Sequence, residues 1–376
     1  MSQADRNVVL LTGLPSLLAR TVCEEILRTD GKGAVRALVR PNERDEMKTA
    51  LDALGVEWRG RVDFVEGDAA SIDFGLSGNE YRALTHEVTH VHHCAHITDL
   101  GVDRARAERI NIGGAHEALE FARCCGRLQC LVFHSTAHVS GDRSGVVYED
   151  DLNVGQSFRN VIEETQARAE KLMRAAMSNV PVAVVRPGTL VGDSRTGAID
   201  RFDGPYLLIL LVVTSPPDLA LPLPGRGDEP VNVVPVDWVA RAAVAIGRDR
   251  RARGGTFHLV DPSPLTARRV FELVARAGGR RGPRGSIPAN LAKALLRAPG
   301  LDRIAKSPRA FLETMTTAVT YDARRADEVL AAAGVPPCPP LDTYIDTLVD
   351  FVKERMRQRR ASKKDPPASV DEGSLA

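Results

Sequence analysis

The chain has 376 residues, 43% hydrophobic and 26% charged, which is long enough for one large globular protein in two parts, or for two modest domains, with a buried core. Its 50 basic and 49 acidic side chains leave a formal net charge of +1, which argues against a nucleic-acid-binding protein with a strongly basic surface. The longest apolar run, residues 207–213, is far shorter than the roughly 20 residues of a membrane helix, so we expect no membrane span.

The N-terminal sequence MSQADRN runs directly into the apolar VVLLTG. It lacks the basic flank and apolar stretch of a signal peptide. The six cysteines lie in apolar segments and form no CxxC pair, which is typical of buried thiols in a reducing compartment. These features predict a cytoplasmic protein.

The first 190 residues alternate short β-rich runs with helix-length segments. The first run is followed at once by a predicted helix over 17–28. Strands separated in this way pair in parallel through right-handed crossovers, and near-continuous apolar strands are covered on both faces. The sequence therefore predicts an α/β protein with a doubly wound, parallel, Rossmann-like sheet in residues 1–192. The expected strands are 7–13, 34–40, 62–68, 88–95, 128–136 and 180–188.

The pattern changes after Gly192 and predicts a smaller, mainly helical substrate-side region over 193–360. Two strand-like pieces, 231–236 and 256–262, are candidates for a return to the edge of the sheet. Residues 361–376 have almost no large apolar side chains and are predicted to be disordered. The basic run 353–364 fits either a solvated helix end or a contact with an anionic partner. The expected helices are 236–248, 265–278, 288–296 and 341–357.

Short motifs accompany the β-rich runs in a fixed order. They are VVLLTG (8–13), LVR (38–40), EGD (66–68), HHCA (92–95), NIGGA (111–115), FHSTAHVSG (133–141), RPG (186–188) and VGDSRTG (191–197). The ordered set resembles the extended short-chain dehydrogenase/reductase family, which is epimerase/dehydratase-like, and within it the thioester reductases and the male-sterility-like fatty-acyl reductases. The resemblance covers about residues 7–350. It implies a NAD(P)-binding fold, and the reaction has to be argued from the site.

The resemblance places the pyrophosphate of a dinucleotide at the turn after the first strand, on backbone N–H groups and a helix N-terminus. Family members carry three spaced glycines there, whereas this chain has Gly13, Ser16 and Ala19. A Cβ at Ser16 would intrude on the phosphates, although its hydroxyl could donate to a phosphate oxygen. The alternative is an ordinary strand-to-helix turn that holds no dinucleotide.

Arg40 ends the second strand, where the resemblance places the adenosine ribose. A guanidinium suits a 2′-phosphate, so we expect NADP(H) rather than NAD(H) if a dinucleotide binds; the alternative is a solvated arginine before a proline. The resemblance implies that Asp68 bonds the adenine, unless it is simply a turn aspartate. The remaining implied cofactor contacts are Leu17, Ala95, Pro187 and Gly188.

In the family an asparagine, a serine or threonine, and a Tyr-x-x-x-Lys pair transfer the proton and hold the nicotinamide ribose. Asn111 and Thr136 match the first two positions. When 158–173 is aligned on FRN and AEKL, the tyrosine position holds Ile162 and the lysine position holds Gln166. Isoleucine cannot donate a proton and glutamine carries no charge. The usual mechanism is therefore relaxed or replaced.

Substitute proton donors are scarce. His138 would share the strand face of Thr136 if the strand continues that far, and imidazole titrates near neutral pH. His96, after the HHCA strand, is a further candidate. Glu163 and Glu164 flank the vacant position but fit solvent-facing helix carboxylates better. The histidines of THVHHCAH (89–96) also suggest metal binding, but a sheet covered on both faces leaves little room for an open site, and we assign no metal ligand.

These features predict a NAD(P)(H)-dependent oxidoreductase-family protein with a degenerate active site, acting on an acyl thioester, aldehyde or ketone. The alternatives are a catalytically inactive pseudoenzyme or binding module, and a non-redox isomerase or lyase on the same scaffold. The apolar residues 206–213 either line a pocket for an acyl chain or form a core helix of the smaller part. By resemblance, the chain could also form a homodimer.

Overall fold

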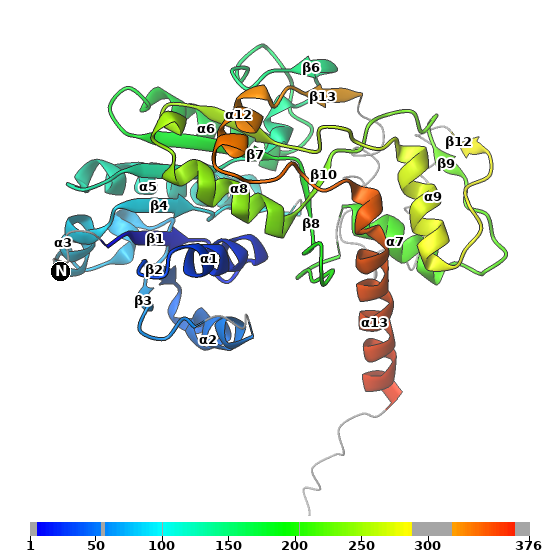
Figure 1. Ribbon diagram of the computed structural model, residues 1–376, viewed down its shortest axis with the longest axis horizontal. Coiled ribbons are helices and arrows are strands. Elements are labelled where there is room, and N and C mark those ends of the chain that lie inside the picture. The colour runs from blue at the N-terminus through cyan, green and yellow to red at the C-terminus, as the bar shows by residue number, and fades with distance from the viewer. Residues whose placement is uncertain (1–5, 54–56, 100, 203, 288–317, 365–376) are drawn as a thin grey trace, which may run out of the picture.

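A computed structural model describes residues 6–53, 57–99, 101–202, 204–287 and 318–364. Seven parallel strands form its central sheet in the order β11-β7-β5-β4-β1-β2-β3 (Figure 1). The strands are β1 (Val8–Thr12), β2 (Ala34–Val39), β3 (Val62–Glu66), β4 (His90–His93), β5 (Cys130–His134), β7 (Val182–Pro187) and β11 (Thr256–Leu259). Each of the six strands expected in the first half lies within its predicted range, so the Rossmann-like prediction is confirmed.

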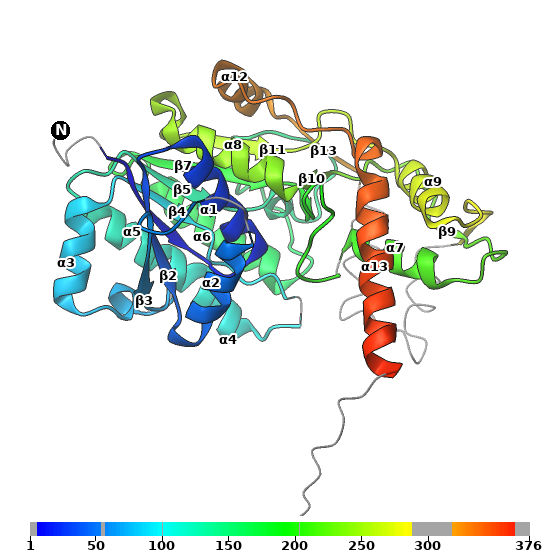
Figure 2. The same ribbon diagram turned by 60° about the horizontal axis from the view of Figure 1, so that its bottom comes forward.

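Helices cover both faces of the sheet, which explains why its strands are apolar along their whole length. One face packs on α1 (Leu17–Thr29), α2 (Arg44–Asp52) and α8 (Val236–Arg248). The other face packs on α3 (Gly78–Glu87), α5 (Gly114–Cys124) and α6 (Val161–Ala175). Figure 2 shows the two helical layers on either side of the strands. The large buried cores on both faces hold the strand ends, and the loops beyond them, in fixed positions.

The chain after Gly192 partly returns to this sheet. β11 pairs with β7 at the edge, which confirms one of the two candidate pieces. The other piece contributes β10 (Val233–Pro235), which pairs with β8 (Thr189–Val191) in a separate two-stranded sheet. β7 ends at Pro187, whose missing N–H removes one donor from the ladder, and β8 begins two residues later at Thr189, outside the seven-stranded sheet.

A second apolar core lies in the smaller part, where α7 (Pro205–Thr214), α9 (Ala267–Gly278) and α13 (Ile345–Lys364) pack together. The predicted helices 236–248 and 265–278 are confirmed by α8 and α9. α13 continues to Lys364, so the expected disorder is wrong for 361–364, where Ala, Ser and two Lys extend the helix. The predicted helix 288–296 and the rest of the tail lie outside the described residues.

Several short elements complete the fold. Within the described ranges, no helix is both long enough and apolar enough to cross a membrane. All six cysteines are free thiols. The remaining elements are α4 (Arg104–Ala107), α12 (Arg324–Ala332), β6 (Gly145–Val147) with β13 (Val319–Tyr321), β9 (Leu223–Pro224) with β12 (Ser286–Ile287), and short helical turns at Pro41–Glu43, Ile72–Gly75, Arg250–Ala252 and Leu341–Thr343.

Candidate functional site

The strand order reverses between β1 and β4, because the chain proceeds from β1 towards β2 on one side and from β4 towards β5 on the other. In open parallel sheets, ligands bind outside the carboxyl ends of the strands at such a crossing. The loops that follow β1, β2, β4, β5 and β7 meet at this edge. They contain Gly13, Ser16, Arg40, Ala95, His96, Thr136, His138 and Gly188, whereas Asp68 follows β3, Leu17 begins α1, Asn111 lies in the helical segment before α5 and Pro187 ends β7.

The turn after β1 brings the chain directly against β4. Gly13 has φ +90°, and a Cβ placed there would lie 2.5 Å from the carbonyl carbon of Cys94 and 2.7 Å from the nitrogen of Ala95, so only glycine fits. Ser16 is exposed at the N-cap of α1 and accepts a long hydrogen bond from the Ala19 nitrogen, 3.4 Å. Leu17 is the first helical residue. The Ser16 O–H hydrogen is therefore available to a ligand at the helix N-terminus.

Three arginines lie around the ends of β2 and β3. The Arg40 side chain is 55% exposed, and its Nε donates to Glu43 Oε2 at 3.0 Å. Arg44 pairs with Glu66 at 2.8 Å, and Arg109 lies 3.8 Å from Asp68. The Asp68 carboxylate also accepts from the Ala70 nitrogen, as a turn aspartate does. This end of the site can therefore offer several guanidinium groups to an anion.

Asn111 connects the loop after β4 to α6. It sits in a π-helical turn, Glu108–Gly113, and is buried. Its Oδ1 accepts from the Ile97 nitrogen at 2.8 Å, and its Nδ2 donates to Thr165 Oγ1 at 2.9 Å. Because both ends of the amide are occupied, Asn111 holds the segment that contains Ala95 and His96 in place.

His138 lies in a turn after β5 and not on the strand. β5 ends at His134, and residues Ala137–Ser140 form a 3₁₀ turn, so the expected shared strand face with Thr136 is wrong. The turn forms because Thr136 Oγ1 accepts from the His138 nitrogen at 3.2 Å. The His138 ring instead bonds Thr189 Oγ1 through Nε2 at 3.1 Å, and burial lowers its pKa to about 4. Such a ring is almost entirely neutral at pH 7.

The Thr189 partner of His138 directly follows the motif at the carboxyl end of β7. Gly188 donates its N–H to the Leu259 carbonyl, and a Cβ on it would lie 2.7 Å from Asn232 Oδ1. Pro187 and Gly188 thus stand beside the loop after β5. The structure brings Thr136, His138 and the RPG motif to one end of the edge, and the Gly13 turn to the crossing between β1 and β4.

α6 runs antiparallel to β5, so its first turns lie beyond the carboxyl edge of the sheet. Glu170 meets Ser135, which directly follows β5, at 2.6 Å. Gln166 lies one helical turn closer to the N-terminus of α6 than Glu170, and Ile162 lies one turn beyond Gln166. Gln166 is only 2% exposed, and its Oε1 has no hydrogen-bond partner. Ile162 is half-buried. A buried unpaired amide oxygen requires a donor that the protein itself does not supply.

The two glutamates beside Ile162 are both paired with arginines. Glu164 forms a bidentate pair with Arg104, 2.9 and 2.8 Å, on the outer face of the helix. Glu163 is buried rather than solvent-facing, contrary to the expectation. It accepts from the Arg159 nitrogen at 3.0 Å and lies 3.4 Å from its guanidinium, and burial raises its pKa. Glu163 is buried because it folds back over the first turn of α6.

The histidines of β4 bond to neighbouring side chains rather than gathering around one point. His92 Nδ1 lies 3.2 Å from His134 Nε2, and His93 Nδ1 lies 3.0 Å from Thr12 Oγ1. His96 has no partner at Nδ1, and burial lowers its pKa to about 4. No three histidine, cysteine, aspartate or glutamate side chains are grouped as metal ligands in the part of the chain that the structure describes.

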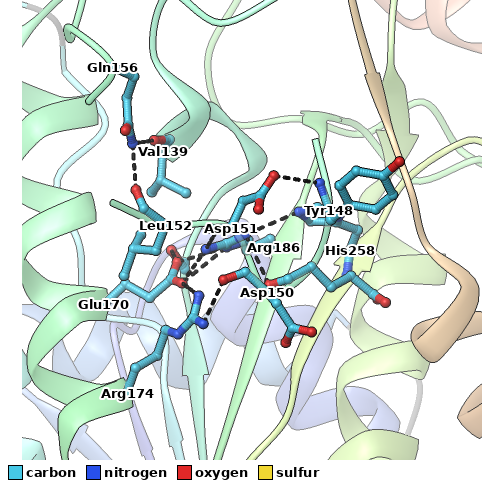
Figure 3. Close-up of polar contacts among 12 residues, drawn as sticks. Val139, Tyr148, Asp150, Asp151, Leu152, Gln156, Glu170, Arg174, Arg186 and His258 are labelled. Carbon is cyan, nitrogen blue, oxygen red and sulfur yellow. Dashed lines mark hydrogen bonds and ion pairs between the residues drawn. The ribbon is translucent and has the colours of Figure 1, made fainter. Parts of the chain in front are cut away.

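A buried ion pair that was not predicted from the sequence lies directly below this edge. The Arg186 side chain is 1% exposed and the Glu170 side chain is fully buried. Arg186 Nη2 donates to Glu170 Oε1 at 2.5 Å and to the Asp151 carbonyl at 2.7 Å, as Figure 3 shows. Its Nη1 lies 3.2 Å from His258 Nε2. The available signal was an arginine in the apolar strand VAVVRP and a glutamate on an apolar helix face, since buried charges are normally paired.

A surface hollow of about 370 Å³ lies away from this edge. It is lined by residues 150–154 and by Lys171, Arg174 and Ala175. These α6 residues belong to the end of the helix that lies towards the amino ends of the strands. The hollow therefore does not belong to the candidate site.

A family model described as "Male sterility protein" matches residues 11–243. Among curated relatives, glycine betaine reductase ATRR of Emericella nidulans is 27% identical over 297 residues, which are 74% of this chain and 23% of the relative. The fatty acyl-CoA reductase wat of Drosophila melanogaster is 24% identical over 281 residues, 64% of this chain and 54% of the relative. The chain thus spans from about a quarter to about half of the length of these relatives.

Solved structures share the fold over nearly the whole chain. The terminal R domain from the myxalamid biosynthetic pathway superposes with a TM-score of 0.76 at 22% identity, covering 93% of this chain and 91% of that one. The reductase domain of a nonribosomal peptide synthetase from Mycobacterium tuberculosis gives 0.68 at 21% identity, covering 92% of each. A UDP-glucuronic acid 4-epimerase from Bacillus cereus, in complex with NAD, gives 0.67 at 17% identity, covering 94% and 98%.

Proposed function

Because the chain belongs to the male sterility protein family, whose model covers more than half of its length, we propose that it binds a nicotinamide dinucleotide and acts as an oxidoreductase on an acyl thioester, aldehyde or ketone. The observation that carries this proposal is the crossing between β1 and β4, where the Gly13 turn delivers the N-terminus of α1 to the carboxyl edge. A relative named as a fatty acyl-CoA reductase supports an acyl thioester as the substrate class.

The residues at the edge fit a dinucleotide. The absence of a side chain at Gly13 lets the backbone of this turn approach Cys94 and Ala95 closely. Ser16 is exposed and caps the helix from outside, so its hydroxyl can donate to a phosphate oxygen. The buried Gln166 Oε1 lacks a donor, and a ribose hydroxyl can supply one. Arg40 suits a 2′-phosphate, and Asp68 can accept from an adenine amino group.

When bound, the nicotinamide would supply the hydride. The residues of this chain would bind and orient the cofactor and the substrate, and would protonate the substrate oxygen. The α1 N-terminus and Ser16 would hold the pyrophosphate, and Gln166 would hold the ribose. Asn111 would keep the loop after β4 in place. The Thr136 hydroxyl is the remaining donor for a substrate oxygen, because its hydrogen is not needed to cap the following turn. His138 and His96 are neutral at pH 7, which makes both weak general acids.

A second candidate function is binding without turnover. Ile162 and Gln166 favour it, since neither position carries an acid or a cation and the neighbouring Glu163 and Glu164 are paired with arginines. Removal of a positioned general acid typically costs about 10²–10⁴-fold in rate. Both candidate functions predict dinucleotide binding, and only the first predicts turnover, so binding has to be measured first.

Calorimetric titration with NADPH and NADH, in parallel with melting curves, tests the proposal. At about 100 times its dissociation constant a ligand stabilises the fold by roughly 2.7 kcal/mol, which is a clear shift in melting temperature. We expect NADPH to bind more tightly than NADH, and Arg40→Ala to weaken NADPH about tenfold while leaving NADH nearly unchanged, because only NADPH carries the 2′-phosphate. Lys48→Ala, on the exposed side of α2, is the matched control. Equal losses for both cofactors would exclude Arg40 from the 2′-phosphate.

Restoring the missing pair should raise turnover. Because α6 carries residues 162 and 166 one helical turn apart at the edge, Ile162→Tyr with Gln166→Lys should increase NADPH-dependent reduction of a medium-chain acyl-CoA thioester or aldehyde by about 10²-fold. The matched control is Ile162→Phe with Gln166→Met, which has similar volume and no acid or cation. If the cofactor binds and the restored variant is no faster than this control, the pair is not the only missing part.

A further inference from the structure

The segment Asp193–Phe202, which we call the strap, joins β8 to α7 and lies against the candidate site. Its Asp200 carboxylate contacts Arg20 of α1, with Nη2 and Oδ1 2.5 Å apart. Arg201 donates to Thr98 Oγ1, in the loop after β4, at 3.2 Å. In Figure 1 the strap runs in green below β8 towards α1. The smaller part thereby touches α1 and the loop after β4, which follow the two strands of the crossing.

The other side of the strap is fixed to α13. Gly197 has φ +71°, and a Cβ on it would lie 2.6 Å from the Thr347 carbonyl oxygen. The Phe202 ring packs against Phe351 of α13 and Tyr206 of α7, with ring centroids 6.3 and 5.7 Å apart. Because these contacts anchor the strap at both its middle and its end, the position of Asp200 is set by the smaller part.

Arg20 has an unusual position for a cation. It is the fourth residue of α1, and helical side chains lean towards the helix N-terminus. The N-terminus carries the positive end of the helix dipole, where a guanidinium is unfavourable unless an anion is present. The anion observed there is the Asp200 carboxylate. The Arg20 side chain is 20% exposed and the Asp200 side chain 43%, so a ligand can reach this pair from solvent.

We propose that Arg20 is a further phosphate-binding residue of the dinucleotide site, and that Asp200 occupies the place of a phosphate oxygen until the cofactor arrives. This rests on the proposed function, since it requires a dinucleotide at the crossing. A guanidinium binds phosphate with charge-assisted hydrogen bonds. Cofactor binding therefore competes with the strap contact. The pyrophosphate is common to NADPH and NADH, so the competition affects both cofactors equally.

The test is a double-mutant cycle on full-length protein, with dissociation constants for NADPH and NADH measured by calorimetry. Asp200→Asn should increase the affinity for both cofactors about threefold to fivefold, because this is the modest strength of an exposed ion pair. Arg20→Gln should weaken both about tenfold. In the Arg20→Gln background, Asp200→Asn should have no further effect. Asp150→Asn, which breaks the exposed pair with Arg325, is the matched control and should change neither constant. Melting curves without cofactor check that each variant folds.

The outcomes separate this inference from the proposed function. If wild type binds a dinucleotide and Asp200→Asn leaves its affinity unchanged, the inference is overturned and the proposed function stands. Weakening of NADPH alone by Arg20→Gln would also overturn it, because Arg20 would then contact the 2′-phosphate. Binding by Asp200→Asn but not by wild type would support the inference strongly. If none of the folded proteins binds a dinucleotide, both the inference and the proposed cofactor fail.

Discussion

Arg186→Met should lower the free energy of unfolding by about 3–5 kcal/mol, the usual cost of removing one partner of a buried ion pair. The substitution leaves the Glu170 carboxylate in the core with the Ser135 hydroxyl at 2.6 Å and Arg174 at 3.7 Å. It also removes the donor to the Asp151 carbonyl. Urea unfolding, followed by tryptophan fluorescence and circular dichroism, measures the loss.

Two further variants make this prediction specific. Arg325→Met breaks the exposed pair with Asp150 and should cost no more than about 1 kcal/mol. Arg186→Met combined with Glu170→Met should recover part of the loss, since no uncompensated charge remains in the core. A loss for Arg186→Met as small as that for Arg325→Met would mean that water reaches the Glu170 carboxylate.

Mild acid should unfold the protein, with a midpoint between about pH 5 and 6. Seven of the nine histidines have pKa values that burial lowers, and a buried imidazole must charge when the chain unfolds. The pKa is about 3 for His92 and His93, about 4 for His90, His96, His138 and His258, and well below its usual value for His134.

The direction follows from proton binding. Well above pH 6.5, the ordinary histidine pKa, these groups are neutral in both the folded and the unfolded state, and their contribution to stability is complete. As pH falls from 6.5 towards 4, these histidines bind protons in the unfolded chain but stay neutral in the folded chain, so stability decreases. Each histidine contributes up to about 1.4 kcal/mol per pH unit. Seven such groups together can cancel a total stability of about 5–15 kcal/mol within two units.

The measurement is the free energy of urea unfolding at several pH values and constant ionic strength. His93→Gln should reduce the slope of the unfolding free energy against pH, between pH 6.5 and 5, by the equivalent of about one proton. His116→Gln, on the exposed side of α5, is the control and should leave the slope unchanged. A protein that keeps its full stability at pH 4.5 would contradict the prediction.

The sequence predicted the layout of the sheet and the composition of its edge. The apolar runs and the segments between them gave six strands in their correct places, because local periodicity is strong where both faces are buried. The separate pairing of β10 was not predictable, since it joins Val233 to Thr189 of β8, a partner far away in the sequence. Glu163 looked solvent-facing because its fold-back onto Arg159 does not appear in helical periodicity.

Side-chain partners far apart in sequence were the main omission. The pair of Arg20 with Asp200 joins residues 180 positions apart, and no local pattern contains this information. Arg186 and Glu170 were visible as charges in apolar surroundings, but the topology was needed to bring β7 and α6 together. The altered positions 162 and 166 were found from motif order, whereas the unpaired oxygen of Gln166 required the structure.

The antiparallel packing of α6 on β5 divides the helix into two halves with different freedom to change. The half beside the sheet carries Glu170, whose replacement disturbs the core. The half beyond the sheet carries Ile162, whose side chain has no hydrogen-bonding group, and Gln166, whose Oε1 has no hydrogen-bond partner among the described residues. Substitutions at positions 162 and 166 can therefore change the catalytic groups of this protein at little cost to folding. In this way one scaffold can lose a reaction and stay folded, or acquire a different reaction.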